Sequence, residues 1–323
     1  MTLTPLAPTT AFIVGPHSVI SHNGIVFNDR STTECYWVTE FGGFDAADLR
    51  LSSEENTQED GELAGPGFRD ARVMTMTGAI RAGSYTKYLE MARALLDAYS
   101  GPLVETPMLI RPATGSTIFA HPEMQIGCRL SDKPQVETAL RESDLRGMIK
   151  RPFTIALKAH KQPMYESVVE HYDDLVPTAI SQLGRVYDRT YDLVYETFLD
   201  SSGNPALSGN SITVHNDGNY GAKPVIRFTG SMSGISLINE TNGHRINLKH
   251  SIADGEYIEV DVREGRVRNH LGENAMATWD LSSDWLELDG KRGGATGDNV
   301  LSLLVDSFSG SPKVEIWWRD TIN

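Results

Sequence analysis

The residue types that carry out catalysis are present in this chain, but their spacing does not assemble a catalytic motif. Gly230-Ser231-Met232-Ser233-Gly234 has the glycines of a nucleophile elbow, yet Met232 stands where the nucleophile belongs and no helical pattern follows. Gly293-Gly294-Ala295-Thr296-Gly297 lacks the Gly-Lys-Ser/Thr ending of a phosphate-binding loop. Both runs are typical of hairpin turns, so we predict no catalytic residue, no enzymatic activity and no cofactor.

Metal-ligand spacing is also missing. The histidines of the second half are His215, His244, His250 and His270. No two of them lie within four residues of each other, whereas zinc sites usually contain a closely spaced ligand pair. The acidic residues around Asp254 do not follow the pattern of a calcium loop. Cys35 and Cys128 lie in strand-like runs and are predicted to be small buried hydrophobes. We therefore predict no metal site.

Tryptophans are the remaining side chains that could bind a ligand, because sandwich domains that bind sugars often use exposed Trp beside polar groups. The candidates are Trp279, Trp285, Trp317 and Trp318. Trp285 and Trp318 are in phase with core positions and are predicted to be buried. Trp317 points the other way, and we expect it to be an exposed anchor at an interface before it is a sugar platform.

In the first half, the pattern predicts strands with one helix laid against them. Residues 71–82 alternate, with Val73, Thr75 and Thr77 on one side and Met74, Met76 and Gly78 on the other. Ser84 is a predicted N-cap for a helix over 85–99, which ends at Gly101-Pro102. The other predicted strands are 12–14, 25–27, 34–40, 108–111, 117–120, 124–130 and 153–159, with a turn at Asn23-Gly24 and an acidic loop over 52–67.

Three segments depart from this pattern. Residues 131–150 indicate a polar excursion with a short helical piece, and 165–183 indicate a partly helical segment broken at Pro177. The tyrosines of 185–198 recur every four residues, which fits either a helix or an extended arm, and we favour the arm. Residues 201–210 have the composition of a linker.

The second half is predicted to be nearly all β. Residues 212–246 contain short β-branched runs separated by Asn-, Asp- and Gly-rich turns, and Pro224 stands at the first position of the strand 225–228. The strand 257–262 places Ile258, Val260 and Val262 on one face, and 313–319 places Val314, Ile316 and Trp318 inward. Turn signals about every ten residues are typical of a β-sandwich.

Length and charge bound the classes of function. The chain of 323 residues is long enough for two domains. Its net charge of −14 argues against a protein that grips nucleic acid, because phosphates need a basic surface. No apolar run reaches the length of a membrane span, and the first residues lack the features of a secretory signal. We expect no membrane insertion.

The ordered series of motifs resembles the distal tail proteins of long, non-contractile phage tails, the siphophage tail-component family. Its pieces are Asp60-Gly61, residues 72–80 with the helix behind them, Arg151-Pro152-Phe153 leading into Ala156-Leu157, Val214 to Asn219, Pro224-Val225-Ile226, Ile238-Asn239 to Gly243, Gly255 to Asp261, and Trp317-Trp318-Arg319. Relative to that family, 131–150 and 166–183 are expected to be insertions.

The resemblance implies a mainly β fold: an N-terminal ring-forming sheet or split barrel with a helix over 84–99, spanning 1–165, and a C-terminal galectin-like β-sandwich over 206–323. Residues 166–205 are then a linker or insertion. It also implies a structural role at the distal end of the phage tail. There a ring, usually hexameric, joins the tail tube protein to the tip proteins and keeps a channel open through which DNA passes without specific binding.

Strand edges such as 71–82 are liabilities in a monomer but assembly surfaces in a ring. The residues expected at the contact between copies are Arg72, Val73, Thr75, Thr77 and Ile80. The alternative functions are a carbohydrate-binding, receptor-binding module at the tail tip, which would use Trp317, and a hydrolase, for which the sequence shows no nucleophile and base. A fold alone does not decide between them.

Overall fold

The computed structural model describes residues 18–29, 31–44, 48–50, 53–55, 62–65, 68–101, 104–111, 123–137, 148–161, 164–177, 211–291 and 293–323. The chain divides into two compact units, Met1–Val169 with Thr321–Asn323, and Glu170–Asp320. The expected linker 166–205 is thus divided: 166–169 belong to the first unit, 170–177 to the second, and 178–205 lie outside the described residues, as do the expected strands 12–14 and 117–120 and the expected arm 185–198.

The first unit is a closed β-barrel. Its strands are β1 (Val19–His22), β2 (Ile25–Phe27), β3 (Cys35–Gly42), β8 (Arg72–Ala82), β9 (Thr106–Arg111), β10 (Met124–Val136) and β11 (Ile149–Ala159). They are hydrogen-bonded in the order β11-β8-β3-β2-β1-β9-β10, and pairing of β10 with β11 closes the ring of strands. The short strands β12 (Tyr165–Ser167) and β24 (Thr321–Ile322) extend the sheet from β10.

Two smaller hairpins interrupt the segment between β3 and β8. They pair β4 (Leu49–Arg50) with β7 (Phe68–Arg69) and β5 (Ser53–Glu55) with β6 (Glu62–Ala64). The expected acidic loop over 52–67 therefore contains a strand pair. The predicted turn at Asn23-Gly24 is confirmed, because both residues have positive φ, 49° and 78°, as a tight hairpin between β1 and β2 requires.

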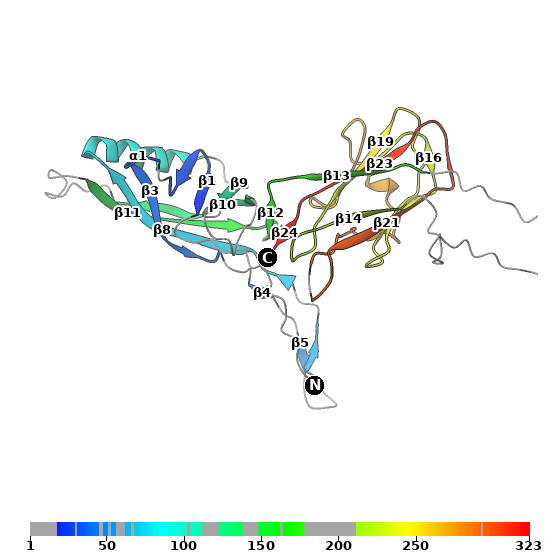
Figure 1. Ribbon diagram of the computed structural model, residues 1–323, viewed down its shortest axis with the longest axis horizontal. Helices are drawn as coiled ribbons and strands as arrows, with labels where there is room; N and C mark the ends of the chain where they lie inside the picture. Colours follow the sequence, from blue (N-terminus) through cyan, green and yellow to red (C-terminus); the bar gives the residue numbers. More distant parts are fainter. Residues whose placement is uncertain are drawn as a thin grey trace, which may run out of the picture. The chain divides into compact units, whose positions relative to one another are not determined.

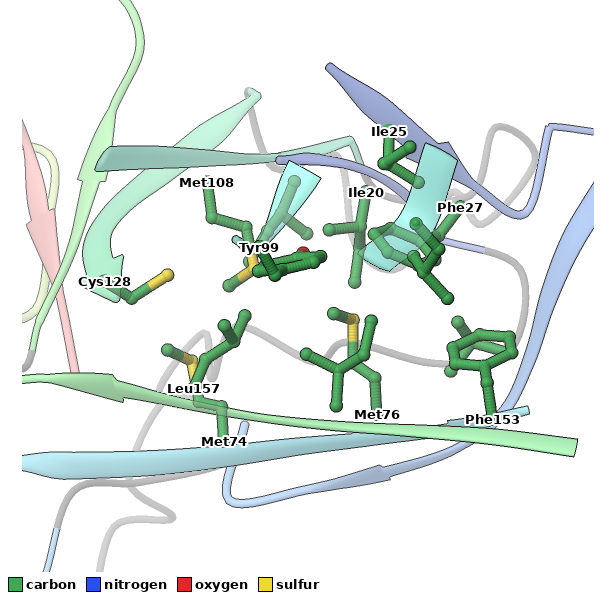
Figure 2. Close-up of a cluster of buried hydrophobic side chains, with 14 of the residues drawn as sticks. Ile20, Ile25, Phe27, Met74, Met76, Tyr99, Met108, Cys128, Phe153 and Leu157 are labelled. Atoms are coloured by element: carbon green, nitrogen blue, oxygen red, sulfur yellow. The ribbon is translucent and has the colours of Figure 1, made fainter. Parts of the chain in front are cut away.

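Side chains from opposite walls fill the barrel (Figure 2). Along β8, alternate residues from Arg72 to Ala82 are buried, which confirms the predicted alternation and places Met74 and Met76 on the inward side. Ile20 and Phe27 lie across from Met76 and Phe153, and all four are at most 1% exposed. This interdigitated core is the main stabilising feature of the unit, because apolar burial is the dominant favourable term in folding.

The helix α1 (Tyr85–Ala98) covers part of this core (Figure 1). Ser84 is its N-cap, as predicted, and its hydroxyl accepts the N–H of Lys87. Tyr88, Ala92 and Leu95 are buried, as expected of a helix laid against the strands, whereas Leu96 is 38% exposed.

The second unit is a two-sheet β-sandwich. One sheet has the order β13-β23-β15-β19-β20, formed by β13 (His171–Leu175), β23 (Lys313–Trp318), β15 (Val225–Thr229), β19 (Tyr257–Asp261) and β20 (Arg266–Asn269). The other has the order β14-β21-β17-β18, formed by β14 (Ser211–His215), β21 (Asp298–Leu304), β17 (Ile235–Asn239) and β18 (Arg245–Leu248). Inward side chains of both sheets form one core that includes Ile226, Leu237, Leu301 and Ile316. A strand pair, β16 (Met232–Ser233) with β22 (Ser307–Phe308), and the short helix η2 (Met276–Thr278) complete the unit.

The predicted mainly β fold class is confirmed, with corrections to two segments. The partly helical pattern expected over 165–183 is wrong where it is described, because 165–167 and 171–175 are strands that pair with β24 and β23. The polar excursion expected from residue 131 begins later, because β10 continues to Val136 along β11. No helix in the described part of the chain is long and apolar enough to span a membrane.

Candidate interaction surfaces

The residues predicted to contact another copy do not offer a strand edge. β8 is hydrogen-bonded on both sides, along its whole length by β11 and from Thr75 to Arg81 by β3. The expectation of a free edge at 71–82 is therefore wrong. Arg72 and Ile80 are 1% and 0% exposed, so they are unavailable for such a contact, and that part of the prediction is wrong too.

Burial of Arg72 has a local reason. Its guanidinium lies 4.5 Å from the centre of the Tyr165 ring and donates to the carbonyl of Phe44. The outward side of β8 remains accessible: Val73 is 48% exposed, and Thr75 and Thr77 are half-buried. A contact between copies through these three side chains stays a prediction.

Trp317 lies on the outer face of the five-stranded sheet, as predicted, but it is half-buried there. Tyr172, 51% exposed, packs against it with ring centres 5.5 Å apart. The Arg227 guanidinium lies 5.3 Å from the Trp317 ring and 4.6 Å from the Tyr257 ring, and pairs with Glu259 at 2.7 Å. Hydrogen bonding to Glu259 raises the pKa of Arg227. The indole of Trp317 is thus packed between the Tyr172 ring and the Arg227 guanidinium.

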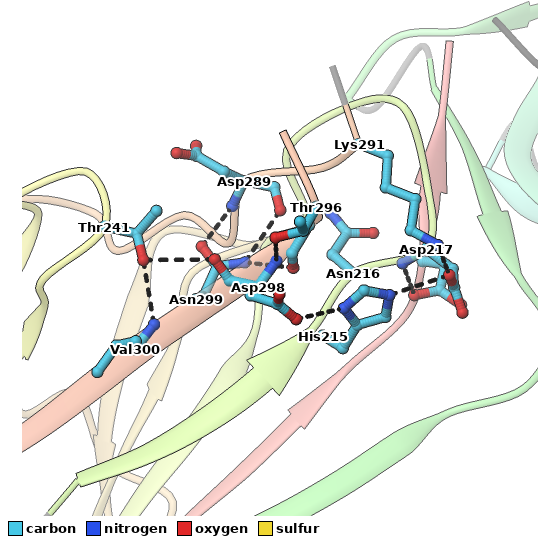
Figure 3. Close-up of polar contacts among 12 residues, drawn as sticks. His215, Asn216, Asp217, Thr241, Asp289, Lys291, Thr296, Asp298, Asn299 and Val300 are labelled. Atoms are coloured by element: carbon cyan, nitrogen blue, oxygen red, sulfur yellow. Dashed lines mark hydrogen bonds and ion pairs between the residues drawn. The ribbon is translucent and has the colours of Figure 1, made fainter. Parts of the chain in front are cut away.

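A network of buried asparagines organises one end of the sandwich (Figure 3). Asn216, Asn239 and Asn299 are each 0% exposed. The Asn299 amide donates to the carbonyls of Asp289 and Gly297, and its oxygen accepts the Asp289 N–H at 2.7 Å and the Asn239 amide at 3.0 Å. Buried amides of this kind replace the backbone partners that irregular segments lack.

This network fixes the segment 285–291. The Asn216 amide donates to the carbonyls of Leu288 and Tyr220, and the Asn239 amide donates to the carbonyl of Glu287. Ala222 and Leu288 also exchange two backbone hydrogen bonds, of 2.8 and 2.9 Å. Asn216 lies in a run whose composition predicts only a turn, and its side chain therefore also positions another loop.

Charged groups surround the same end of the sandwich. The His215 ring lies between two carboxylates, with Asp298 at 2.8 Å from Nδ1 and Asp217 at 3.1 Å from Nε2 (Figure 3). Lys291 pairs with Asp217, and this hydrogen bond is the main cause of the lowered pKa of the Asp217 carboxyl. The Asp298 pKa is lowered chiefly by the Thr296 hydroxyl, and then by His215. In the described part of the chain, no group of three or more His, Cys, Asp or Glu is arranged to hold a metal ion.

Trp285 is not buried, so that prediction is wrong, whereas Trp318 is buried as predicted at 5% exposure. Leu286 and Leu288, both 0% exposed, occupy the inward positions, which turns Trp285 outward with 38% of its surface exposed. Its ring stacks on Trp279 with centres 4.7 Å apart and planes 27° apart.

Trp285 borders a hollow of about 460 Å³ lined by Lys223, Val262, Arg263, Glu264, Gly265, Trp285 and Glu287. A second hollow of about 350 Å³ is lined by Asn219, Tyr220, Gly221, Glu287, Asp289, Gly290 and Ala295. Glu287 belongs to both linings. Its carboxylate lies over the backbone of Gly221, where an added Cβ would be only 1.7 Å from Oε1.

The barrel contains a buried polar cluster that the sequence did not predict. His22, 1% exposed, is bonded to the Tyr99 hydroxyl at 3.0 Å and the Thr106 hydroxyl at 2.9 Å, with the Cys128 sulfur 3.7 Å away. Burial lowers the pKa of His22 to about 4 and raises the pKa of the Cys128 thiol to about 12. Cys35 and Cys128 are free and buried, as predicted.

Neither the buried histidine nor the asparagine network carried a strong signal in the sequence. Asn residues between strands indicate turns, and the pattern does not distinguish an exposed turn from a buried one. Trp279 and Trp285 are six residues apart in the sequence, and their stacking was not predicted because Trp285 was assigned to a core position.

A family model matches most of the second unit. Residues 217–319 match the model of the family described as siphovirus-type tail component, C-terminal domain. The matched stretch begins after Asn216 and includes every strand of the sandwich except β13 and β14, together with all the residues that line the two hollows. None of the curated proteins compared with the chain matches it.

One solved structure has a similar fold over nearly the whole chain. The crystal structure of SPP1 Dit (gp 19.1), described as a paradigm of hub adsorption apparatus in Gram-positive infecting phages, is 13% identical, with a TM-score of 0.58 over 93% of this chain and 98% of that one. The phage P2 baseplate in its activated conformation with Ca is 8% identical, with a TM-score of 0.40 over 93% and 97%. The same baseplate with Sr gives 9% and 0.38.

Proposed function

We propose that this protein is a structural hub at the distal end of a phage tail. The proposal is supported by the match of residues 217–319 to the siphovirus-type tail component C-terminal domain and by the similarity of the fold to SPP1 Dit. In this role it forms a ring, hexameric in the proposal, that connects the tail tube protein to the tip proteins. The family match over residues 217–319 is the observation that carries the proposal.

The outward side of β8 supports assembly through side chains. Because β8 is hydrogen-bonded to a strand on each side, a strand from another copy cannot pair with its backbone. Val73, at 48% exposure, with the half-buried Thr75 and Thr77 forms a small apolar and hydroxyl surface without charge. Surfaces depleted of charge are typical of the centre of protein interfaces.

Acidic charge supports passage of DNA through such a ring. The chain carries 43 acidic and 29 basic residues, a net charge of −14. An acidic lumen would repel phosphate and keep the DNA from binding while it passes. The proposal involves no catalytic step and no cofactor, and the tail-tip proteins are the partners it requires.

Virions labelled with an antibody against this chain test the location. The proposal predicts label at the distal end of the tail, between the tube and the tip. Label along the tube, at the head, or absent from complete virions would refute it.

A further inference from the structure

The hollow beside Trp285 combines the two features that a saccharide site needs, an exposed aromatic face and a ring of hydrogen-bonding side chains. We propose that this hollow and the adjoining one beside Tyr220 form a binding site for a neutral oligosaccharide. Nothing in the hub role requires such a site, and the inference does not depend on ring formation.

The indole of Trp285 is held in a fixed orientation. One of its faces stacks on Trp279, whose own position is set by a backbone bridge to Leu248. Asp284 donates its N–H to the carbonyl of Arg245 at 2.7 Å, and Leu286 is anchored in the core. A rigid, partly exposed aromatic ring can stack on the C–H face of a sugar ring without losing much side-chain entropy.

Gly265 keeps the ring accessible from the turn between β19 and β20. Its φ of +62° favours glycine, and a Cβ there would lie 3.8 Å from the six-membered ring of Trp285. A larger side chain at this position would cover the part of the indole that borders the hollow.

Polar groups around the ring suit hydroxyls. Lys223 and Arg263 supply donors and Glu264 and Glu287 supply acceptors. Each sugar hydroxyl both donates and accepts, so it can use groups of either kind. Two cations and two carboxylates balance each other in this lining, and the whole chain has a net charge of −14, so an anionic ligand gains nothing from the site.

The two hollows share Glu287 in their linings, so a ligand longer than one sugar could reach from one hollow to the other. Both are lined by Glu287, and Tyr220 provides a second aromatic side chain in the hollow of about 350 Å³. Each volume falls within the range of about 300–1,000 Å³ that small-ligand sites have. The Asn216 and Asn239 bonds to the segment 285–291 preorganise the shared wall.

Trp317, the tryptophan expected to be exposed, is the less suitable platform. Its ring is packed by Tyr172 and by the Arg227 guanidinium, whereas Trp285 borders an open hollow. The two residues therefore make a matched pair of variants within one unit, each removing one outward tryptophan.

The test uses the full chain on an array of immobilised neutral and acidic oligosaccharides that includes chitohexaose, maltohexaose, cellohexaose and mannohexaose. The neutral hexamer that binds best is then titrated calorimetrically. We expect saturable binding whose Kd is unchanged between low and high salt, because a neutral ligand has no ion pair to screen. Trp285→Ala should weaken binding by about tenfold or more, and Trp317→Ala should leave it unchanged.

Glu287→Gln guards against a folding defect in Trp285→Ala, since the amide keeps the size of the carboxylate. Loss of a charge-assisted hydrogen bond should weaken binding by about tenfold at an unchanged unfolding temperature. Absence of binding to every neutral glycan on the array, binding of acidic glycans alone, or equal losses in Trp285→Ala and Trp317→Ala would overturn the proposal. A chain that stays monomeric and binds the neutral hexamer would refute the ring but retain this site.

Discussion

Asn299 illustrates how single buried amides hold the second unit together. Its side chain satisfies the N–H and carbonyl of Asp289 and the carbonyl of Gly297 while fully enclosed. Removing the amide leaves these backbone groups without partners in a site that water does not reach. The cost of such orphaned groups exceeds the net value of the hydrogen bonds themselves.

Asn299→Ala is accordingly expected to destabilise the second unit by roughly 2–4 kcal/mol. Asn274→Ala is the matched control, because Asn274 is exposed and accepts a single backbone bond from Met276. Urea unfolding of the two variants measures the difference. Equal losses would show that the buried network contributes no more than an ordinary exposed turn.

Because of His22, the stability of the first unit should decrease at acidic pH. Its pKa is lowered from 6.5 to about 4, mainly because burial disfavours the charged ring. Above pH 6.5 the ring is neutral in both the folded and the unfolded chain, so it adds no pH dependence. Between pH 6.5 and 4 only the unfolded chain binds the proton, and the folded state loses stability as the pH falls.

The loss attributable to His22 should reach roughly 3 kcal/mol near pH 4 and then level off. His22→Gln removes this term, so the difference in unfolding free energy between wild type and variant should shrink as the pH is lowered from 7.5 to 4.5. His160→Gln, at an exposed position, serves as the control and should show no such trend. A constant difference for His22→Gln would contradict the assignment.

Burial of single side chains could be predicted where inward and outward residues alternate regularly along a strand. Trp318 lies in a strand with three inward positions in phase, Val314, Ile316 and Trp318, and its burial followed directly. Trp285 precedes Leu286 and Leu288, which compete for the same core positions, and only the tertiary packing decided between the two phases. The partners of His22 come from three separate elements and no local pattern unites them.

At the scale of elements, β8 is the central strand on which the barrel depends. Gly78 lies against β3 where that strand has an irregularity between Val38 and Glu40. A Cβ at Gly78 would be 2.1 Å from the Trp37 carbonyl oxygen, and rigid backbone cannot give way cheaply.

Gly78→Ala should therefore destabilise the first unit by about 3 kcal/mol or more, since the clash forces β3 and β8 apart. Gly127→Ala in β10 is the control, because a Cβ there meets nothing within 4 Å. Thermal unfolding distinguishes the two. A Gly78→Ala protein as stable as Gly127→Ala would mean that β3 and β8 are not packed as described.

The sequence predicted which segments form strands and helices better than it predicted which strands lie next to one another. The alternation of 71–82 and the helix beginning after Ser84 follow from local residue types, and both are confirmed. That β8 is central and not an edge depends on β3 and β11, which pair with it from far away in the sequence. Pattern alone does not encode that pairing.

For the whole molecule, the resemblance to siphophage distal tail proteins is confirmed by the family match over 217–319 and by the fold shared with SPP1 Dit. The family match lies within the second unit, whereas the resemblance of the first unit is supported only by the similarity of its fold to SPP1 Dit. Assembly through the outward side of β8 remains a proposal with a direct mutational test.

Val73→Asp should prevent assembly by placing a charge at the centre of that surface, while the unfolding temperature stays close to that of the wild type. Val104→Asp is the matched control, since Val104 is 65% exposed in the same unit and lines a hollow with Tyr99, Thr106 and Leu130, to which no β8 residue contributes. Sedimentation velocity reports the outcome. Assembly lost in Val104→Asp and kept in Val73→Asp would assign the contact to another face.

Ring formation itself is the claim on which the account depends, and the mass of the purified chain in solution tests it most directly. Mass photometry should give a species at six times the 35.6 kDa of one chain. A single species at 35.6 kDa over the whole accessible concentration range would contradict the account.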